Sequence, residues 1–295
     1  MTEKRTVLIT GCSSGGIGSA LAKELYSQGF RVFATSRRLE SMEELSALRI
    51  ETLTLDVTDV DAIRNTRDEV AGRTGGKLDV LVNNANIPAA YPVAATDMDM
   101  SAVRALFEIN VFAPIIMVQE IIQLLISSGK GRVVNIGSMC GIMPVPFSAA
   151  YNTSKAALHS FGDTLRVELA QAPGLFYSIK HLEVITGGVK SNIDKPNTIP
   201  ADSLYKEMEE VYQAKRVGRS QSTYEYLQSL SYARIVVVEV MWAKPRAWIW
   251  AGSNSLLCWF IDTFLPRAVF DWLLSKICGF QKFSVQIRSV KDKNM

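Results

Sequence analysis

The stretch VLITGCSSGGIG, residues 7–18, decides the fold of this chain. It begins with aliphatic and β-branched residues, which are typical of a buried parallel strand. Apolar residues then recur at helical spacing at Ile17, Leu21 and Leu25, so we expect a helix that begins near Gly16 or Ile17. A glycine turn between a strand and a helix lets backbone N–H groups approach a pyrophosphate, and the helix N-terminus adds the positive end of its dipole. The stretch therefore predicts a dinucleotide-binding strand–turn–helix.

The end of the next expected strand, residues 31–35, indicates which dinucleotide is bound. Ser36, Arg37 and Arg38 follow this strand. A site for NAD usually has an acidic side chain here to bind the ribose 2′-hydroxyl, whereas a 2′-phosphate requires a cation. The guanidinium of Arg37 presents planar donors suited to a phosphate, and the hydroxyl of Ser13 would add to them. The pattern favours NADP; the alternative is that Arg37 and Arg38 are solvated surface charges.

A second group of residues carries acid chemistry. Tyr151 and Lys155 are one turn apart at the start of a helix that we expect to run to about residue 170. A phenol with a pKa of about 10 releases its proton slowly at neutral pH, and the nearby ammonium of Lys155 would lower that barrier. Ser138 follows the expected strand 132–136, so it would hold a substrate oxygen at the carboxyl edge of the sheet.

A fourth candidate, Asn110, lies on a helical stretch that we expect over residues 100–125. It is a candidate support for a proton relay; the alternative is an ordinary polar residue of a helix. Reduction of a ketone needs a hydride at one face of the carbonyl and an acid at its oxygen. A dinucleotide turn followed by Ser138, Tyr151 and Lys155 therefore predicts a nicotinamide-dependent carbonyl reductase.

From residue 6 to about residue 252, the chain resembles the short-chain dehydrogenase/reductase family. The matching segments are the glycine turn, Asp56-Val57, Asn83-Asn84-Ala85, Asn110, Ser138, Tyr151-x-x-x-Lys155 and Gly188-Val189-x-Ser191. The resemblance implies that Asp56 and Val57 lie at the adenine of the cofactor and that Asn83 lies near its ribose. It also implies that Tyr151 and Lys155 contact the nicotinamide ribose. In the same family Val189 and Ser191 would contact the carboxamide and the phosphates. The expected cofactor-binding residues are Gly11, Ser13, Ser14, Gly16, Ile17, Gly18, Arg37, Arg38, Asp56, Val57, Asn83, Asn84, Tyr151, Lys155, Val189 and Ser191.

Three features depart from the family pattern. Residues 10–18 are one residue longer than the usual spacing TGxxxGxG, so we expect a small bulge near Ser14 or Gly15. Asn86 stands where the family usually has Gly. Residues 186–188, Thr-Gly-Gly, replace the usual Pro-Gly, and Gly lacks the φ restraint of Pro.

Within the family, residues 185–189, residues 76–79 and an apolar C-terminal extension resemble the 1-acyldihydroxyacetone-phosphate reductases. That branch uses NADPH to make lysophosphatidate at lipid droplets or the endoplasmic reticulum. The leading candidate substrate is therefore 1-acyldihydroxyacetone phosphate. Two alternatives are open. One keeps the chemistry but acts on a polyketide, terpenoid or steroid ketone or alcohol; the other is a non-catalytic NADP-binding protein.

The remaining strand-like runs define the fold class. Residues 51–55, 78–82, 132–136, 178–185 and 247–251 alternate with helical stretches, which implies right-handed βαβ units. We expect an α/β, doubly wound Rossmann fold with a seven-stranded parallel sheet and helices on both faces. With 295 residues and 48% apolar composition, one large core is possible. The predicted catalytic domain is 1–252, with a substrate lid at 190–219, and an apolar helical extension follows at 253–295.

Composition excludes several classes of protein. A formal charge of +3 without a basic run argues against a nucleic-acid partner. The four cysteines lack metal spacing and are expected to be free thiols in a reducing compartment. Neither His159 nor His181 predicts a metal site, and His159 is interpreted as structural. The first strand begins at about residue 6, which leaves no room for a cleavable signal, so we expect a cytoplasmic protein.

Two regions are expected to shape the substrate side. Residues 141–147 would form an apolar wall before Tyr151. The lid is polar, and its cations would either meet a substrate phosphate or be solvated. These cations are Lys190, Lys195, Lys215, Arg216 and Arg219.

The C-terminal extension has two apolar stretches, 256–265 and 268–280. Each stretch is shorter than the roughly 20 apolar residues that a membrane-spanning helix needs. Two interpretations are open for residues 253–280: a peripheral contact with the endoplasmic reticulum or a lipid droplet, or packing against the core or a second subunit. The family resemblance also implies a homodimer or homotetramer paired through helices near residues 102–125 and 152–170.

Overall fold

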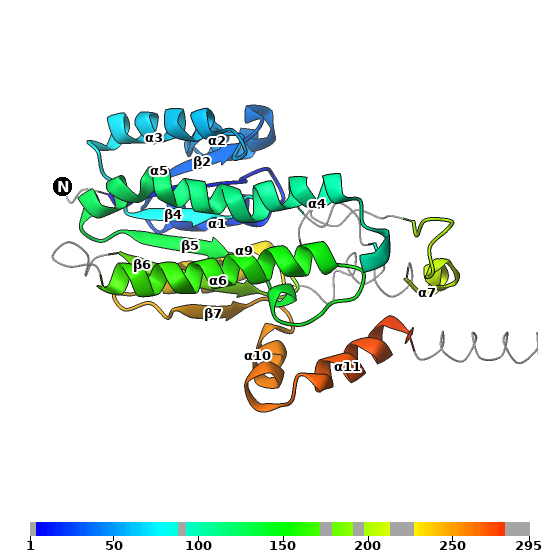
Figure 1. Cartoon of the computed structure of the whole chain (residues 1–295). Coiled ribbons are helices and arrows are strands. Elements are labelled where there is room, and N and C mark those ends of the chain that lie inside the picture. Colours follow the sequence, from blue (N-terminus) through cyan, green and yellow to red (C-terminus); the bar gives the residue numbers. More distant parts are fainter. Residues whose placement is uncertain (1–3, 88–92, 172–178, 191–197, 213–226, 281–295) are drawn as a thin grey trace, which may run out of the picture.

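The computed structural model describes residues 4–87, 93–171, 179–190, 198–212 and 227–280. Seven parallel strands form one sheet in the order β3-β2-β1-β4-β5-β6-β7 (Figure 1). The strands are β1 (Thr6–Ile9), β2 (Arg31–Ser36), β3 (Glu51–Thr54), β4 (Val80–Asn83), β5 (Arg132–Ile136), β6 (Lys180–Thr186) and β7 (Trp248–Ala251). The expected doubly wound α/β fold is confirmed.

Helices cover both faces of this sheet. Side chains alternate along each strand, so Val7 and Ile9 of β1 pack on one face with α1 and α9, and Leu8 packs on the other with α3, α5 and α6. The helices are α1 (Ile17–Ser27), α2 (Glu43–Ala47), α3 (Val60–Thr74), α4 (Met100–Phe107), α5 (Ala113–Ser128), α6 (Ala149–Gln171), α7 (Glu209–Tyr212), α9 (Ser229–Met241), α10 (Ser255–Phe264) and α11 (Ala268–Cys278). Short 3₁₀ turns are η1 (Leu39–Met42), η2 (Ala95–Asp97), η4 (Met139–Gly141) and η5 (Lys206–Met208).

The order of the strands reverses between β1 and β4. Chain connections run outward from β1 to β3 on one side, and from β4 to β7 on the other. In open parallel sheets, ligands bind at the carboxyl ends of the strands where the order reverses. The glycine turn after β1 and the asparagines after β4 lie at this point.

The expected helix over residues 100–125 is interrupted. α4 and α5 are joined by a π turn, η3 (Glu108–Phe112), which carries Asn110. The continuous stretch Met100–Ser128 is, by length and composition alone, long and apolar enough to cross a membrane. Met117, Ile121 and Leu125 nevertheless lie in the protein core, as in a core helix of a globular fold.

The C-terminal helices α10 and α11 pack at the β7 edge of the sheet (Figure 1). Cys258, Ile261 and Phe270 are buried there, and Arg267 Nη2 donates to the carbonyl of Ile142 at 2.7 Å. The opposite side of α10 and part of α11 remain exposed. The exposed large apolar residues are Leu256, Leu257, Trp259, Phe260, Phe264, Leu265 and Trp272.

Candidate active site

The glycine turn can be built only from glycine at two points. Gly11 has a φ of +72°, and a Cβ there would lie 2.7 Å from the Cα of Ala85. A Cβ on Gly18 would lie 2.4 Å from the carbonyl oxygen of Gly11. Gly15 has a φ of +74°, and the N–H of Gly16 donates to the carbonyl of Ser13 at 3.1 Å. A left-handed residue therefore stands at one of the two positions, Ser14 or Gly15, where the length of the turn led us to expect a bulge.

The backbone then enters α1, so the N–H groups of the turn gather at a helix N-terminus. Gly16 is the N-cap of α1 and Ile17 is its first residue. No side chain caps this terminus, which leaves its N–H groups suited to an anion.

Asn84 holds this turn in place. Its Nδ2 donates to the carbonyls of Thr10 at 2.8 Å and Gly11 at 2.9 Å, and its backbone N–H donates to Thr10 Oγ1 at 3.0 Å. The side chain of Asn84 thus connects the end of β4 to the turn after β1. Asn84 would therefore contribute to a cofactor site by fixing the conformation of the turn.

Asn83 presents an unused acceptor beside the turn. Its Nδ2 donates to Asn135 Oδ1 at 3.0 Å, and its own Oδ1 is buried and without a hydrogen-bond partner among the described residues. A buried acceptor without a donor is costly. A hydroxyl group of a bound nucleotide would relieve this cost, so the site fits a ribose.

Three serine hydroxyls gather at the end of β2. Ser36 Oγ lies 2.9 Å from both Ser13 Oγ and Ser41 Oγ. Arg37 and Arg38 follow β2 and are exposed. The sequence had pointed to Ser13 but missed Ser41, which reaches the cluster from η1.

Arg37 also acts on a neighbouring acid. Asp56 Oδ1 accepts the N–H of Thr58 at 2.9 Å and its hydroxyl at 2.8 Å. These bonds, chiefly the one from the backbone, and then the positive charge of Arg37, lower the pKa of Asp56. Val57 beside it is buried. The hydroxyls and cations at this edge therefore suit an adenosine carrying a 2′-phosphate.

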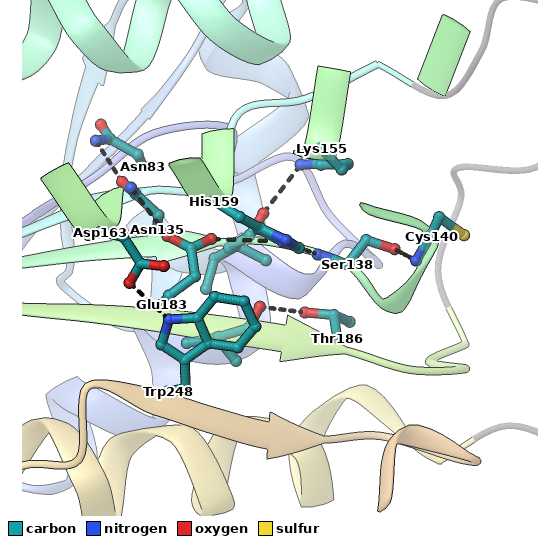
Figure 2. Close-up of polar contacts among 12 residues, drawn as sticks. Asn83, Asn135, Ser138, Cys140, Lys155, His159, Asp163, Glu183, Thr186 and Trp248 are labelled. Carbon is teal, nitrogen blue, oxygen red and sulfur yellow. Dashed lines mark hydrogen bonds and ion pairs between the residues drawn. The ribbon is translucent and has the colours of Figure 1, made fainter. Parts of the chain in front are cut away.

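The helix α6 brings Tyr151 and Lys155 to one face. Lys155 is fully buried, and its Nζ donates to the carbonyl of Ile136 at 2.9 Å (Figure 2). The same Nζ lies 5.7 Å from the centre of the Tyr151 ring. Burial, partly offset by the negative charge of Glu183, lowers the pKa of Lys155 to about 8. The ammonium is therefore still the main form at neutral pH.

Ser138 lies just after β5, opposite the start of α6. Its Oγ accepts the backbone N–H of Cys140 at 3.1 Å, which leaves the hydroxyl hydrogen available for donation. Its own N–H donates to Nε2 of His159 at 3.2 Å (Figure 2). The structure thus brings Ser138 and Lys155 to the same end of β5. Lys155 is bonded to Ile136, just before Gly137, and Ser138, just after Gly137, is bonded to His159.

Asn110 is fully engaged. Its Oδ1 accepts the N–H of Ile87 at 3.0 Å, and its Nδ2 donates to the carbonyl of Ile87 at 3.1 Å and to Ser154 Oγ at 3.2 Å. Ser154 precedes Lys155 on α6. Asn110 therefore fixes the segment after β4 against the helix of the candidate catalytic pair.

The loop after β6 reaches the same edge of the sheet. The N–H of Gly188 donates to the carbonyl of Ser253 at 2.8 Å. A Cβ on Gly187 would lie 2.2 Å from that carbonyl oxygen, which explains glycine there. Val189 is buried, whereas Ser191 lies outside the described residues. Of the predicted lid cations, Lys190 is exposed and Lys195, Lys215, Arg216 and Arg219 lie outside the described residues.

An apolar cluster lies beside the N-terminus of α6. Phe147, four residues before Tyr151, stacks on Phe280 with ring centres 5.7 Å apart and meets the edge of Tyr205 at 5.7 Å. Ala94, Ile199 and Met208 complete the buried cluster. The sequence predicted the Phe147 wall but not Phe280, because the two residues lie 133 positions apart. The chain just before the helix that carries Tyr151 is therefore anchored in an apolar cluster.

Comparisons with known proteins agree with this geometry. A family model described as short chain dehydrogenase matches residues 5–200. The Short-chain dehydrogenase RED1 of Pyricularia oryzae is 39% identical over 274 residues, which cover 93% of this chain and 94% of the relative. The NADPH-dependent 1-acyldihydroxyacetone phosphate reductase of Schizosaccharomyces pombe is 40% identical over 212 residues, 70% of this chain and 69% of the relative. The crystal structure of a short-chain dehydrogenase from Streptomyces avermitilis matches with a TM-score of 0.74 and 26% identity, over 97% of this chain and 99% of that one.

Proposed function

The chain belongs to the short-chain dehydrogenase family and is an oxidoreductase, and on that premise we propose that it uses NADPH to reduce an apolar ketone to a secondary alcohol. One observation carries the proposal. Lys155, a buried cation, is held 2.9 Å from the end of β5 and 5.7 Å from the Tyr151 ring, with Ser138 at the same strand end. This is the set of groups that protonation of a carbonyl oxygen requires.

Each residue has a separate task in the reaction. The hydroxyl of Ser138 donates a hydrogen bond to the carbonyl oxygen and orients it. The phenol of Tyr151 then gives its proton to the same oxygen. The ammonium of Lys155 favours that transfer, because a positive charge stabilises the phenolate left behind. Bound NADPH would supply the hydride.

The preference for NADPH is supported by the end of β2. No acidic side chain stands at the three positions after Thr35. Instead the Ser13, Ser36 and Ser41 hydroxyls meet there, and two arginines follow. The unused Oδ1 of Asn83 supports a ribose at the switch point of the sheet.

The leading substrate is 1-acyldihydroxyacetone phosphate. The name of the Schizosaccharomyces pombe relative supports it, and so does the aromatic cluster of Phe147, Tyr205 and Phe280, which suits an acyl chain. The second candidate is a polyketide, terpenoid or steroid ketone, or the reverse oxidation of an alcohol. The Pyricularia oryzae relative, which matches 93% of this chain, has a name that states a short-chain dehydrogenase and no acylated phosphate, so the screen includes this candidate.

A screen of NADPH consumption with the full chain separates these candidates. The panel is 1-acyldihydroxyacetone phosphate, dihydroxyacetone phosphate, a steroid ketone and an aromatic polyketide ketone, each with NADPH and with NADH. We expect fastest oxidation of NADPH with the acylated phosphate, and little with dihydroxyacetone phosphate, which lacks the acyl chain. A faster polyketide or steroid reaction selects the second candidate, and no reaction with any ketone contradicts the proposed reduction.

We also propose a location and an assembly. The exposed apolar side of α10, with Trp259, Phe260 and Phe264, supports a peripheral contact of residues 253–280 with the endoplasmic reticulum or a lipid droplet from the cytoplasm. Exposed Phe112 and Val167 on the α5 and α6 side support pairing into a homodimer or homotetramer. Flotation with phosphatidylcholine vesicles tests the membrane contact. The double change Trp259→Ser and Phe260→Ser should abolish flotation, and unchanged flotation contradicts the membrane contact.

Light scattering of the full chain tests the assembly. A mass equal to that of a monomer contradicts the homodimer or homotetramer.

A further inference from the structure

His159 stands in line with the proposed catalytic residues. Tyr151, Lys155 and His159 follow one another at four-residue spacing on α6, so they share one face of the helix. The imidazole is buried. Its Nε2 accepts the backbone N–H of Ser138 at 3.2 Å. The helix that carries the proposed acid is therefore bonded directly to the residue proposed to hold the substrate oxygen.

Two side chains of α6 hold the end of β5 on either side of one glycine. Lys155 Nζ donates to the carbonyl of Ile136, the residue before Gly137, and His159 accepts from Ser138, the residue after it (Figure 2). A Cβ on Gly137 would lie 2.5 Å from His159 Nε2 and 2.5 Å from Glu183 Oε1. The close approach needs glycine, and it leaves the Ser138 peptide little freedom.

The hydrogen bond to Ser138 fixes the form of the imidazole. A nitrogen that accepts an N–H cannot carry a proton, so the neutral ring has its hydrogen on Nδ1. Burial, and then the positive charge of Lys155, lower the pKa of His159 to about 4. The acceptor is thus present throughout the neutral range.

The ring is itself held from behind. Trp248 of β7 packs against it, with ring centres 5.4 Å apart, and Trp248 Nε1 donates to Asp163 Oδ1 at 2.8 Å, one turn further along α6. Glu183 Oε1 of β6 lies 3.7 Å from His159 Nε2 (Figure 2). Contacts from β6 and β7 therefore set the position of the imidazole, and Asp163 of α6 in turn holds Trp248.

We propose that His159 is a positioning residue for the reduction. By accepting the Ser138 N–H, it holds the Ser138 hydroxyl where this hydroxyl and the Tyr151 phenol can bond the same carbonyl oxygen. The inference rests on the proposed function, because it assigns a role through Ser138. The competing explanation is a core histidine that contributes to stability alone. The two differ in whether the effect of His159 depends on the Ser138 hydroxyl.

His181 is a matched control. It is also a buried imidazole beside Glu183, with Nε2 3.6 Å from Glu183 Oε2, and burial lowers its pKa to about 4 as well. Its Nε2 contacts Asn135 Nδ2 at 3.0 Å and not Ser138. Asn135 Nδ2 keeps a second acceptor in Glu183 Oε2 at 3.2 Å. Removal of His181 therefore repeats the loss of a buried imidazole without the loss of the Ser138 bond.

The test is a double-mutant cycle on the full chain, measured with the ketone that the wild type reduces fastest. We expect His159→Leu to lower kcat about 10- to 100-fold, as a small misplacement of a reacting group does, with KM and the Kd for NADPH nearly unchanged. In a Ser138→Ala background the same change should alter kcat less than about twofold. His159→Gln, whose amide oxygen can accept, should recover part of the loss. His181→Leu should lower the melting temperature but keep kcat within about twofold.

The failures are distinguishable. An effect of His159→Leu that persists in full without the Ser138 hydroxyl overturns the proposal, and so does an equal loss of kcat in His181→Leu. A Ser138→Ala enzyme with the wild-type kcat contradicts the proposed function, and this inference falls with it. A Ser138→Ala loss of activity beside an unchanged His159→Leu enzyme removes the role of His159 alone.

Discussion

Lys155 should make the protein less stable at neutral pH than an apolar residue in its place. The side chain is fully buried, and its pKa falls from the ordinary 10.5 to about 8, chiefly through loss of hydration. A fall of that size means that burying the charged form costs about 3 kcal/mol of folding free energy. In the proposed reaction, this cost is the consequence of placing a cation beside Tyr151.

Lys155→Met removes this cost and keeps a side chain of similar length. It also leaves the carbonyl of Ile136 without its donor at 2.9 Å, which costs about 1–2 kcal/mol. At pH 7 the lysine is protonated in both the folded and the unfolded state, so the burial cost is fully present. The variant should then be more stable than the wild type by about 1–2 kcal/mol.

The difference should reverse at alkaline pH. Between pH 8 and 10.5 the unfolded lysine holds a proton that the folded one has released, so the wild type gains stability as the pH rises. The Met variant has no such gain. Above this range it should be the less stable protein by about 1–2 kcal/mol, because only the lost hydrogen bond remains.

Urea unfolding of the two proteins without cofactor, from pH 7 to 10.5, measures this difference. Changes from titrating groups that do not interact with Lys155 are common to both proteins and cancel, and His159, with a pKa of about 4, stays neutral throughout this range. Lys180→Met, at the exposed first residue of β6, is the control and should show no such reversal. A Met variant that is less stable than the wild type at pH 7, or a difference that does not change with pH, refutes the reasoning.

Three further changes test the cofactor and substrate sides. Arg37→Asp should weaken NADPH about 10- to 100-fold and NADH much less, as the loss of a charge-assisted bond to a phosphate would; equal weakening, measured by nucleotide fluorescence, argues against a phosphate contact. Gly18→Ala places a Cβ 2.4 Å from the Gly11 carbonyl, so it should lower stability by about 1–3 kcal/mol and weaken NADPH binding; an unchanged melting temperature would rule out the close approach. Phe280→Ala removes one stacked ring pair, so KM for a long-chain acyl ketone should rise about 2- to 10-fold while the Kd for NADPH stays constant; unchanged KM would separate the aromatic cluster from the substrate.

The elements that depend on local spacing were predictable. Strand β5 has the expected limits, and β1, β2, β3, β6 and β7 agree to within a residue or two, because runs of β-branched residues identify buried strands. The limits of β4 and β6 are each shifted by two residues at the start and by one at the end. The interruption at η3 was missed, because a π turn leaves the apolar period of residues 100–125 almost unchanged.

The parts of the candidate site whose residues lie close together in the chain could be predicted from the sequence. The glycine turn and the Tyr151–Lys155 pair follow from spacing alone. The bond between Ser138 and His159 joins residues 21 positions apart, and it forms only when α6 packs on β5. A signal was nevertheless present: His181 and Glu183 alternate within a buried strand, and polar residues in such a place indicate an internal network.

The most direct test of the account is a single-turnover measurement on Tyr151→Phe. The enzyme–NADPH complex is mixed with the ketone that the wild type reduces fastest, and nicotinamide fluorescence follows both binding and oxidation. The account predicts NADPH bound with nearly the wild-type Kd and no ketone-dependent oxidation, because the phenol that protonates the carbonyl is gone. Oxidation at the wild-type rate would contradict it.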